Sequence, residues 1–277
     1  MVADPEIGKS VSAAGAATNY HDVGTGPPLL LLHGSGPDVT AWANWRGVLP
    51  DLARQFRVIA PDLRGFGRSL PRQNVDYRLA TWAEHLTAFL DALGLQRPSV
   101  VGNSFGGALA LRLATGQPHR VDRLVLMGSV GVDFPITPGL EQVWGFTPSR
   151  ENMRRVLDLF AHDRTRVTDD LAELRLAAAT CPGVQEAFAT MFPPPRQQSV
   201  HALAVDEHEI AALPHRTLIL HGRDDRVIPL DTSLRLHHLI ARSQLHVFGE
   251  CGHWVQIEQH DRFVALVSQF LREDQAG

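Results

Sequence analysis

The chain has 277 residues, of which 44% are hydrophobic and 20% are charged, a composition typical of a globular protein. Its 26 basic and 30 acidic side chains give a formal net charge of −4, which argues against a surface that binds nucleic acid or an anionic membrane. The longest apolar runs, such as Leu29–Leu32, are far too short to cross a bilayer. We therefore expect a cytoplasmic protein with no nucleic-acid or membrane partner, disordered only at roughly residues 1–10 and 273–277.

Short apolar runs alternate with amphipathic stretches through the first half of the chain. The apolar runs are rich in Val, Ile and Leu and lack polar alternation, which is typical of a parallel sheet covered on both faces. Strands are predicted at 29–32, 56–60, 98–102 and 124–127. The amphipathic stretches have apolar residues at helical spacing. Helices are predicted at 41–54, 79–93 and 108–115.

The same alternation returns near the end of the chain. Strands are predicted at 217–220 and 244–248, and helices at 232–241 and 261–271. Repeated strand–helix–strand units of this kind predict an α/β fold with a doubly wound, mostly parallel sheet.

The segment 132–214 interrupts this pattern. It contains predicted helices at 150–160 and 169–180 but no strand signal. We interpret it as a helical lid over the carboxyl ends of the strands, where open α/β sheets bind their ligands. The core would then comprise 1–131 and 215–277. A decorative insertion without function is the alternative.

The strongest chemical signal is a G-x-S-x-G motif at Gly102–Gly106, placed where a strand ends and a helix begins. A sharp turn here would project the Ser104 hydroxyl above the sheet, and a Cβ atom at position 102 or 106 would collide with that turn. The motif therefore predicts Ser104 as a nucleophile.

A serine nucleophile needs a histidine base and a carboxylate that orients it, and in doubly wound sheets these follow in the order Ser, Asp, His. Asp225 comes shortly after one predicted strand and His253 shortly after the next, so both fall on the same sheet edge as Ser104. Asp224 is the competing carboxylate.

A glycine-rich turn, His33–Pro37, directly follows the first predicted strand. Its Ser35 N–H and the N–H of Phe105 are the expected oxyanion hole, which stabilises negative charge on a substrate oxygen. A tight turn with no further role is the alternative. The loop 61–69 is interpreted as structural.

Over residues 6–272 the chain resembles the meta-cleavage product hydrolases, a family of the α/β-hydrolase superfamily that breaks carbon–carbon bonds in aromatic-ring catabolism. The pattern is most similar to members that act on 2-hydroxymuconic semialdehyde. The resemblance is carried by His33–Pro37, Ala41–Trp45, Gly102–Gly107, Gly222–Pro229 and Leu245–Glu258, and in the predicted lid by Asp169–Arg175 and Glu186–Gln197.

The resemblance implies further site residues. The expected substrate contacts are Asn44, Asn103, Arg175 and Trp254. The expected acyl pocket consists of Val130, Ile136, Trp144 and Ile228. Two positions depart from the family pattern, because Asp38 stands where glycine is expected and Val130 where a smaller residue is expected. The first change should stiffen the loop, and the second should disfavour large acyl groups.

The implied activity is hydrolysis of the C5–C6 bond of 2-hydroxymuconic semialdehyde, and of small 6-alkyl analogues, to 2-hydroxypenta-2,4-dienoate and formate or a small carboxylate. The resemblance implies a dienol keto-acid as the small-molecule substrate and a homodimer, and neither it nor any motif calls for a metal or a cofactor. Ser104 could form an acyl-enzyme or activate a water molecule. The alternatives are a carboxylesterase with the same triad and a non-catalytic protein of the same fold that binds a small molecule.

Overall fold

The structure, a computed structural model, describes residues 4–70 and 75–273. A single eight-stranded sheet has the order β1-β2-β4-β3-β5-β6-β7-β8, in which β3 to β8 are parallel and β2 is antiparallel to both its neighbours. The strands are β1 Lys9–Ala13, β2 Ala16–Val23, β3 Pro28–Leu32, β4 Arg57–Pro61, β5 Ser99–Asn103, β6 Leu124–Met127, β7 Thr217–Gly222 and β8 Ser243–Phe248. The predicted doubly wound, mostly parallel sheet is confirmed.

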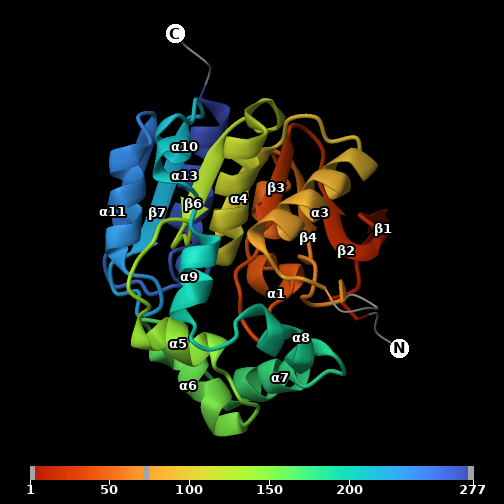
Figure 1. Ribbon diagram of the computed structural model, residues 1–277, viewed down its shortest axis with the longest axis vertical. Helices are drawn as coiled ribbons and strands as arrows, with labels where there is room; N and C mark the ends of the chain where they lie inside the picture. The colour runs from red at the N-terminus through yellow and green to blue at the C-terminus, as the bar shows by residue number, and fades with distance from the viewer. Residues whose placement is uncertain (1–3, 71–74, 274–277) are drawn as a thin grey trace.

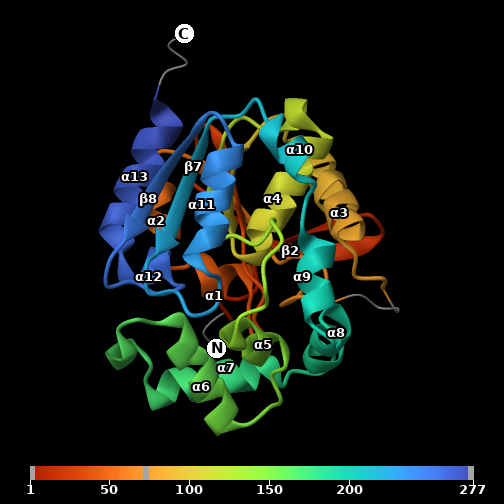
Figure 2. The same cartoon turned by 60° about the vertical axis from the view of Figure 1, so that its left-hand side comes forward.

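Helices cover both faces of this sheet (Figures 1 and 2). Side chains alternate between the faces along a strand. In β3, Leu29 and Leu31 belong to the core on the side of α1, α2 and α13, whereas Leu30 and Leu32 belong to the core on the side of α3, α4 and α11. These helices are α1 Ala41–Trp45, α2 Leu49–Leu52, α3 Leu79–Ala92, α4 Phe105–Gly116, α11 Leu230–Leu239 and α13 His260–Arg272; the short α12 Val255–Glu258 precedes α13.

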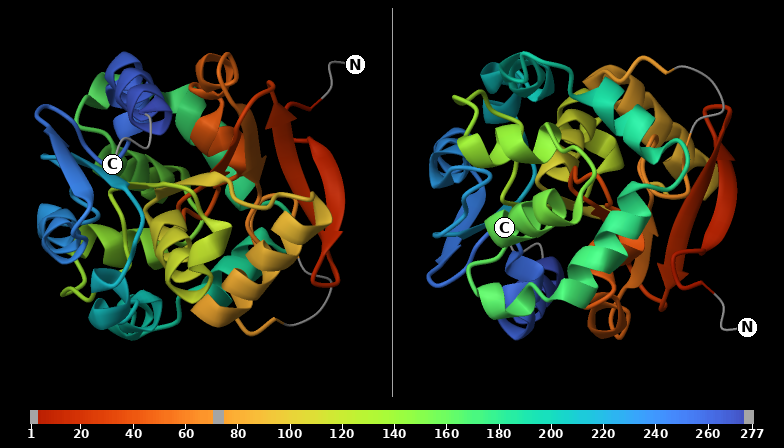
Figure 3. Two further views of the ribbon diagram at one scale, coloured as in Figure 1. Left: turned by 90° about the horizontal axis from the view of Figure 1, so that it is seen from above. Right: turned by 90° about the horizontal axis from the view of Figure 1, so that it is seen from below.

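Most of the lid helices lie below the carboxyl edge of the sheet, and seen from below they lie in front of it (Figures 1 and 3). The last one, α9, lies higher, level with the lower part of the sheet (Figure 2). Three of them begin at a capping side chain, because Thr137, Ser149 and Thr168 each accept a hydrogen bond from a backbone N–H three residues later. The lid helices are α5 Pro138–Trp144, α6 Arg150–Phe160, α7 Asp169–Ala179, α8 Val184–Met191 and α9 Gln197–Leu203.

The last helix of the interrupted segment packs against the core. Helix α10 (Glu207–Ala211) contacts α4 and α11 of the core. Arg112 of α4 lies 3.2 Å from Glu209, and Arg235 of α11 pairs with Glu207. The lid boundary at residue 214 stays a prediction.

Two segments differ from the sequence-based expectations. Strands β1 and β2 form a hairpin, which was not predicted, and its two-residue turn places Ala14 and Gly15 at φ values of 46° and 73°. The predicted helix 41–54 is instead two short helices, α1 and α2. Pro50 explains the restart, because proline is favoured in the first turn of a helix and disfavoured in its interior.

The expected disorder at the N-terminus is wrong for residues 9 and 10, which belong to β1. Lys9 pairs with Tyr20 in the sheet, and its ammonium group lies 2.9 Å from an Asp22 carboxylate oxygen. Residues 1–3 and 274–277, for which disorder was also expected, lie outside the described residues. No helix in the described ranges is long and apolar enough to span a bilayer.

Candidate active site

Ser104 lies at the sharp turn between β5 and α4. Its backbone has φ 53° and ψ −115°, a conformation that residues other than glycine rarely adopt. The turn requires close backbone approach. A Cβ atom on Gly102 would lie 2.5 Å from the carbonyl oxygen of Gly106, and one on Gly106 would lie 2.3 Å from that of Leu32. The glycines of the motif therefore allow the strained turn that exposes the Ser104 side chain to the pocket.

His253 and Asp225 meet at the same edge of the sheet. The Nδ1 atom of His253 lies 2.7 Å from an Asp225 carboxylate oxygen, and both side chains are at most 5% exposed. Because a carboxylate only accepts hydrogen bonds, Nδ1 carries the proton and Nε2 is left as the basic atom. Asp224 points elsewhere, since one of its oxygens accepts a hydrogen bond from the backbone N–H of Cys251.

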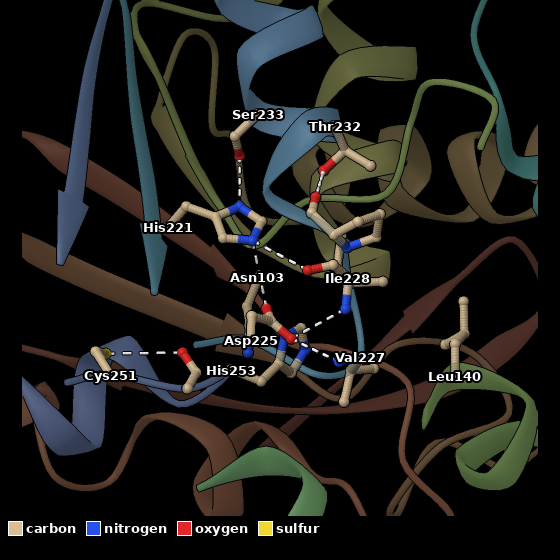
Figure 4. Close-up of polar contacts among 12 residues, drawn as sticks. Asn103, Leu140, His221, Asp225, Val227, Ile228, Thr232, Ser233, Cys251 and His253 are labelled. Atoms are coloured by element: carbon tan, nitrogen blue, oxygen red, sulfur yellow. Dashed lines mark hydrogen bonds and ion pairs between the residues drawn. The ribbon is translucent and has the colours of Figure 1, made fainter. Parts of the chain in front are cut away.

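The Asp225 carboxylate is held from several sides (Figure 4). One oxygen accepts hydrogen bonds from the N–H groups of Val227 and Ile228, at 2.8 and 3.0 Å. Burial by itself raises the pKa of Asp225, but the charge and hydrogen bond of His253 and these further donors outweigh it, so the pKa is lowered. The carboxylate is therefore ionised and fixed against His253.

His221 supports the same carboxylate from β7 (Figure 4). Its Nε2 atom lies 3.1 Å from the Ile228 carbonyl oxygen and 3.6 Å from an Asp225 carboxylate oxygen, while Nδ1 lies 2.7 Å from the Ser233 hydroxyl. Both neighbours of Nε2 are acceptors, so this nitrogen carries the proton. Burial lowers the pKa of His221, which keeps the ring neutral.

One narrow pocket, with a volume of about 40 Å³, brings the candidate residues together. The Ser104 and His253 side chains both line it, although no hydrogen bond joins them, as is common in unliganded active sites. Seven of the residues expected from the sequence line this pocket, namely Ser35, Asn44, Asn103, Ser104, Arg175, His253 and Trp254.

Two backbone N–H groups are candidates for an oxyanion hole. Those of Ser35 and Phe105 have no acceptor within the part of the chain that the structure describes. The Ser35 side chain accepts a hydrogen bond from the lid residue Trp144 at 2.9 Å. At the start of the loop His33–Pro37, the oxyanion loop, His33 accepts a hydrogen bond from the N–H of Leu63 at 2.9 Å. This bond anchors the oxyanion loop to the loop 61–69.

Four polar residues form a polar wall of the pocket: Asn44, Asn103, Arg175 and Gln256. Asn103 donates to the Asn44 side chain at 3.0 Å, and Gln256 donates to the Asn44 carbonyl oxygen at 3.2 Å. Four buried polar atoms on this wall have no partner among the described residues: Asn44 Nδ2, Asn103 Oδ1, Arg175 Nε and Gln256 Oε1. Buried polar groups are rarely left unpaired. Two donors and two acceptors are therefore available to a ligand that carries both kinds of group.

The expected acyl pocket stays a prediction. None of its four members, Val130, Ile136, Trp144 and Ile228, is among the described residues that line this pocket. Trp144 instead stacks on Phe192, with ring centroids 4.4 Å apart. The apolar lining consists mainly of residues that the sequence did not identify, including Leu140, Leu157, Phe160 and Val227. They come from two lid helices and a core loop, so no local motif could have grouped them.

Asp38 contacts the predicted lid. Its carboxylate lies 3.0 Å from the Arg175 guanidinium, and the two side chains are only 6% and 12% exposed. Burial raises the pKa of Asp38, while the Arg175 charge acts in the opposite direction. Arg175, the expected substrate contact in the lid, therefore already has a carboxylate partner.

The described residues contain no cluster of three or more His, Cys, Asp or Glu side chains that could hold a metal ion. The expectation that no metal or cofactor is needed stays a prediction.

Comparison with known proteins places these features in context. Residues 27–259 match the α/β hydrolase fold family. The chain is 61% identical to a 2-hydroxy-6-oxo-2,4-heptadienoate hydrolase of Pseudomonas putida F1, a match that covers 96% of each protein. It is 58% identical to a 2-hydroxymuconate semialdehyde hydrolase of Pseudomonas sp. CF600, over 99% of this chain and 96% of that protein.

Solved structures show the same similarity. A serine-to-alanine mutant of CumD, the meta-cleavage product hydrolase of Pseudomonas fluorescens IP01, complexed with acetates, has a TM-score of 0.96 and 55% sequence identity. That match covers 98% of this chain and 99% of CumD.

Proposed function

The chain belongs to the α/β-hydrolase family and, within it, to the meta-cleavage product hydrolases, and from this we infer that it hydrolyses a carbon–carbon bond. We propose that it cleaves the C5–C6 bond of 2-hydroxymuconic semialdehyde, and of analogues with a small alkyl group at C6. The products are 2-hydroxypenta-2,4-dienoate and formate, or the matching small carboxylate. Two relatives with 58% and 61% identity carry the names of an aldehyde and a methyl-ketone hydrolase, which supports small groups at C6.

The proposed reaction begins with a proton on C5. The dienol becomes a keto acid, and its C2 carbonyl can then accept the electron pair of the C5–C6 bond when that bond breaks. His253, oriented by Asp225, moves the protons. Its contact with that carboxylate, at 2.7 Å, supports the role because it leaves Nε2 free to act as a base.

Ser104 is the proposed nucleophile. It attacks C6, or activates the water that does so, while the N–H groups of Ser35 and Phe105 stabilise the negative charge on the C6 oxygen. The positive φ of Ser104 supports this assignment, since such strain is typical of a nucleophile held at a strand-to-helix turn.

The unpartnered polar wall is the observation that carries the substrate proposal. Arg175 Nε and Asn44 Nδ2 can donate to carboxylate or keto oxygens, whereas Asn103 Oδ1 and Gln256 Oε1 can accept from an enol hydroxyl. The Trp254 indole, a further proposed contact, lies at the same pocket. A carboxylesterase needs none of these groups. The wall therefore favours a dienol acid over a simple ester.

A spectrophotometric screen tests the proposal. Ring-fission products with hydrogen, methyl and phenyl at C6 are compared with a simple aryl ester. We expect rapid bleaching of the hydrogen and methyl compounds, because the relatives with 58% and 61% identity are named for substrates with these groups at C6. Turnover of the ester alone would establish the carboxylesterase alternative, and a preference for phenyl would contradict the proposed C6 specificity.

Replacing the nucleophile separates an enzyme from a protein that only binds its ligand. Ser104→Ala should lower kcat by about 10³-fold or more, because the variant lacks the attacking oxygen. Binding of the dienol should persist, which the shift of its absorption band on mixing would measure. A variant that retains full turnover would contradict the role of Ser104.

A homodimer and a cytoplasmic location are further proposals, and both rest on similarity to the family. Light scattering coupled to gel filtration measures the mass of the particle in solution. A mass twice that of the 30.5 kDa chain would support the dimer.

A further inference from the structure

The Asp38–Arg175 ion pair lies in a wall shared by two cavities. The inner cavity is the pocket of about 40 Å³ that contains Ser104, and the outer cavity, of about 500 Å³, lies between the lid helix α7 and the core. Both are lined by Asp38, Val39, Ala43 and Arg175. The ion pair therefore stands where a path from the outer cavity to the serine would pass.

The inner cavity alone is too small for the proposed substrate. Sites for small organic ligands usually have volumes of about 300–1,000 Å³. The inner pocket is far below this range, and the outer cavity is within it. Opening of the shared wall would join Ser104 to a cavity large enough for a dienol acid.

The ion pair is held mainly by its own charges. Arg175 Nη1 lies 3.0 Å from the Asp38 carboxylate, and its Nη2 atom donates to the Ala43 carbonyl oxygen at 3.3 Å. The Nε atom has no partner among the described residues. The carboxylate of a substrate that reaches Arg175 can thus bind the same guanidinium. Arginine binds carboxylates strongly because it can form two parallel N–H···O hydrogen bonds with them.

We propose that Asp38 is a specificity-determining residue, which occupies Arg175 in the free enzyme and must be displaced there by the carboxylate of the substrate. This inference rests on the proposed function, in which Arg175 binds the carboxylate end of a dienol acid. A neutral ester has no group that can replace Asp38 at Arg175, so its binding does not depend on this exchange. Asp38 thus affects only substrates that carry a carboxylate, whereas Ser104 and His253 act on either kind of substrate.

Displacement of Asp38 from Arg175 by the substrate should make binding depend on pH. The displaced carboxylate loses the positive charge that stabilised it, and its neighbour is then another carboxylate, so it binds a proton more tightly. The charged and titratable groups that line the two cavities around it are Arg175 and His253 in the inner pocket, and Glu6, Arg46, Arg68 and Cys181 in the outer cavity. Binding of the dienol acid should therefore weaken as the pH rises, and binding of a neutral ester should not follow this trend.

The decisive variant is Asp38→Asn, which keeps the shape and removes the competing charge. We expect its KM for the dienol acid to fall by about tenfold, while its KM for p-nitrophenyl acetate changes less than about twofold. The matched control is Glu141→Gln, which breaks the lid ion pair with Arg196, at 2.7 Å, away from both cavities. It should change neither constant.

Two outcomes would overturn the proposal. A rise in KM for the dienol acid in Asp38→Asn would mean that Asp38 orients Arg175 for the substrate, and an equal change for both substrates would mean a purely structural role. If the melting temperature shows that Asp38→Asn does not fold, the wild-type enzyme can be used for the test instead. The ratio of the wild-type KM for the dienol acid to its KM for the ester should rise with pH, and a constant ratio contradicts the proposal. Failure of the wild type to cleave the dienol acid at all would instead contradict the proposed function.

Discussion

Asp225 can orient His253 because its carboxylate has two separate tasks. One oxygen accepts from the N–H groups of Val227 and Ile228, and the other faces His253 Nδ1. The backbone contacts fix the side chain before any substrate binds. Orientation of the base is thus a property of one residue and the turn that follows it.

Asp225→Asn tests this arrangement. The asparagine oxygen can still accept from the backbone, but its NH₂ group would then face His253, force Nδ1 to accept, and place the proton on the catalytic Nε2. We expect kcat to fall by about 10³–10⁴-fold. The neighbouring Asp224→Asn is the control and should retain near-normal kcat, since Asp224 contacts Cys251 and not His253. Equal losses in the two variants would contradict the assignment.

For single residues, the sequence identified candidate site residues by their place at the ends of strands. A local motif could be recognised most directly. Ser104 and its glycines form one continuous motif, so the turn could be foreseen. The partner of Arg175 could not, because Asp38 is separated from it by more than a hundred residues. The apolar lining of the Ser104 pocket could not be predicted for the same reason, since it comes from separate helices and a core loop.

At the scale of elements, strand β3 and helix α4 approach each other more closely than side chains allow. A Cβ atom on Gly106 would lie 2.3 Å from the Leu32 carbonyl oxygen and 2.7 Å from that of His33. Both atoms belong to the backbone and cannot rotate away. The close contact brings the start of α4, and with it the Phe105 N–H, to the oxyanion loop.

We predict that Gly106→Ala destabilises the protein by about 1–3 kcal/mol and lowers kcat, because the helix must move away from the loop. The control is Gly116→Ala at the other end of α4, where a Cβ atom meets nothing within 4 Å. It should be neutral or stabilise by about 0.5 kcal/mol. Urea denaturation measures both effects, and similar stabilities of the two variants would contradict the steric argument.

Most elements could be predicted, and the exceptions have physical causes. The central strands are apolar throughout because both faces are covered, which gives a clear signal. The β1–β2 hairpin has polar and apolar residues mixed, as in Asn19, Tyr20 and His21, and its Ala14-Gly15 turn is not one of the common hairpin sequences. The short helices α5, α8 and α9 offer too few turns for a periodic pattern.

At the scale of the whole molecule, buried histidines determine the response to acid. Burial lowers the pKa of His33 and of His85 to about 4, and it also lowers the pKa of His221. His33 illustrates the cost of a proton, because its Nε2 atom accepts a hydrogen bond from the Leu63 N–H that protonation would break. One carboxyl acts in the opposite direction, since burial raises the pKa of Asp62 to about 6.

We therefore predict that the free energy of unfolding falls as the pH is lowered from about 6.5 to about 4. In this range the unfolded histidines take up protons while folded His33 and His85 stay neutral, so acid favours the unfolded chain. The pKa shifts of His33 and His85 each correspond to about 3 kcal/mol of folding free energy. Proton uptake by folded Asp62 stabilises the folded chain in the same pH range and offsets roughly the loss from one of these two histidines. Urea denaturation at about pH 7 and about pH 5 measures the loss. His85→Gln, which removes one titrating ring, should lose less than the wild type, and a wild-type stability that stays constant over this range would contradict the argument.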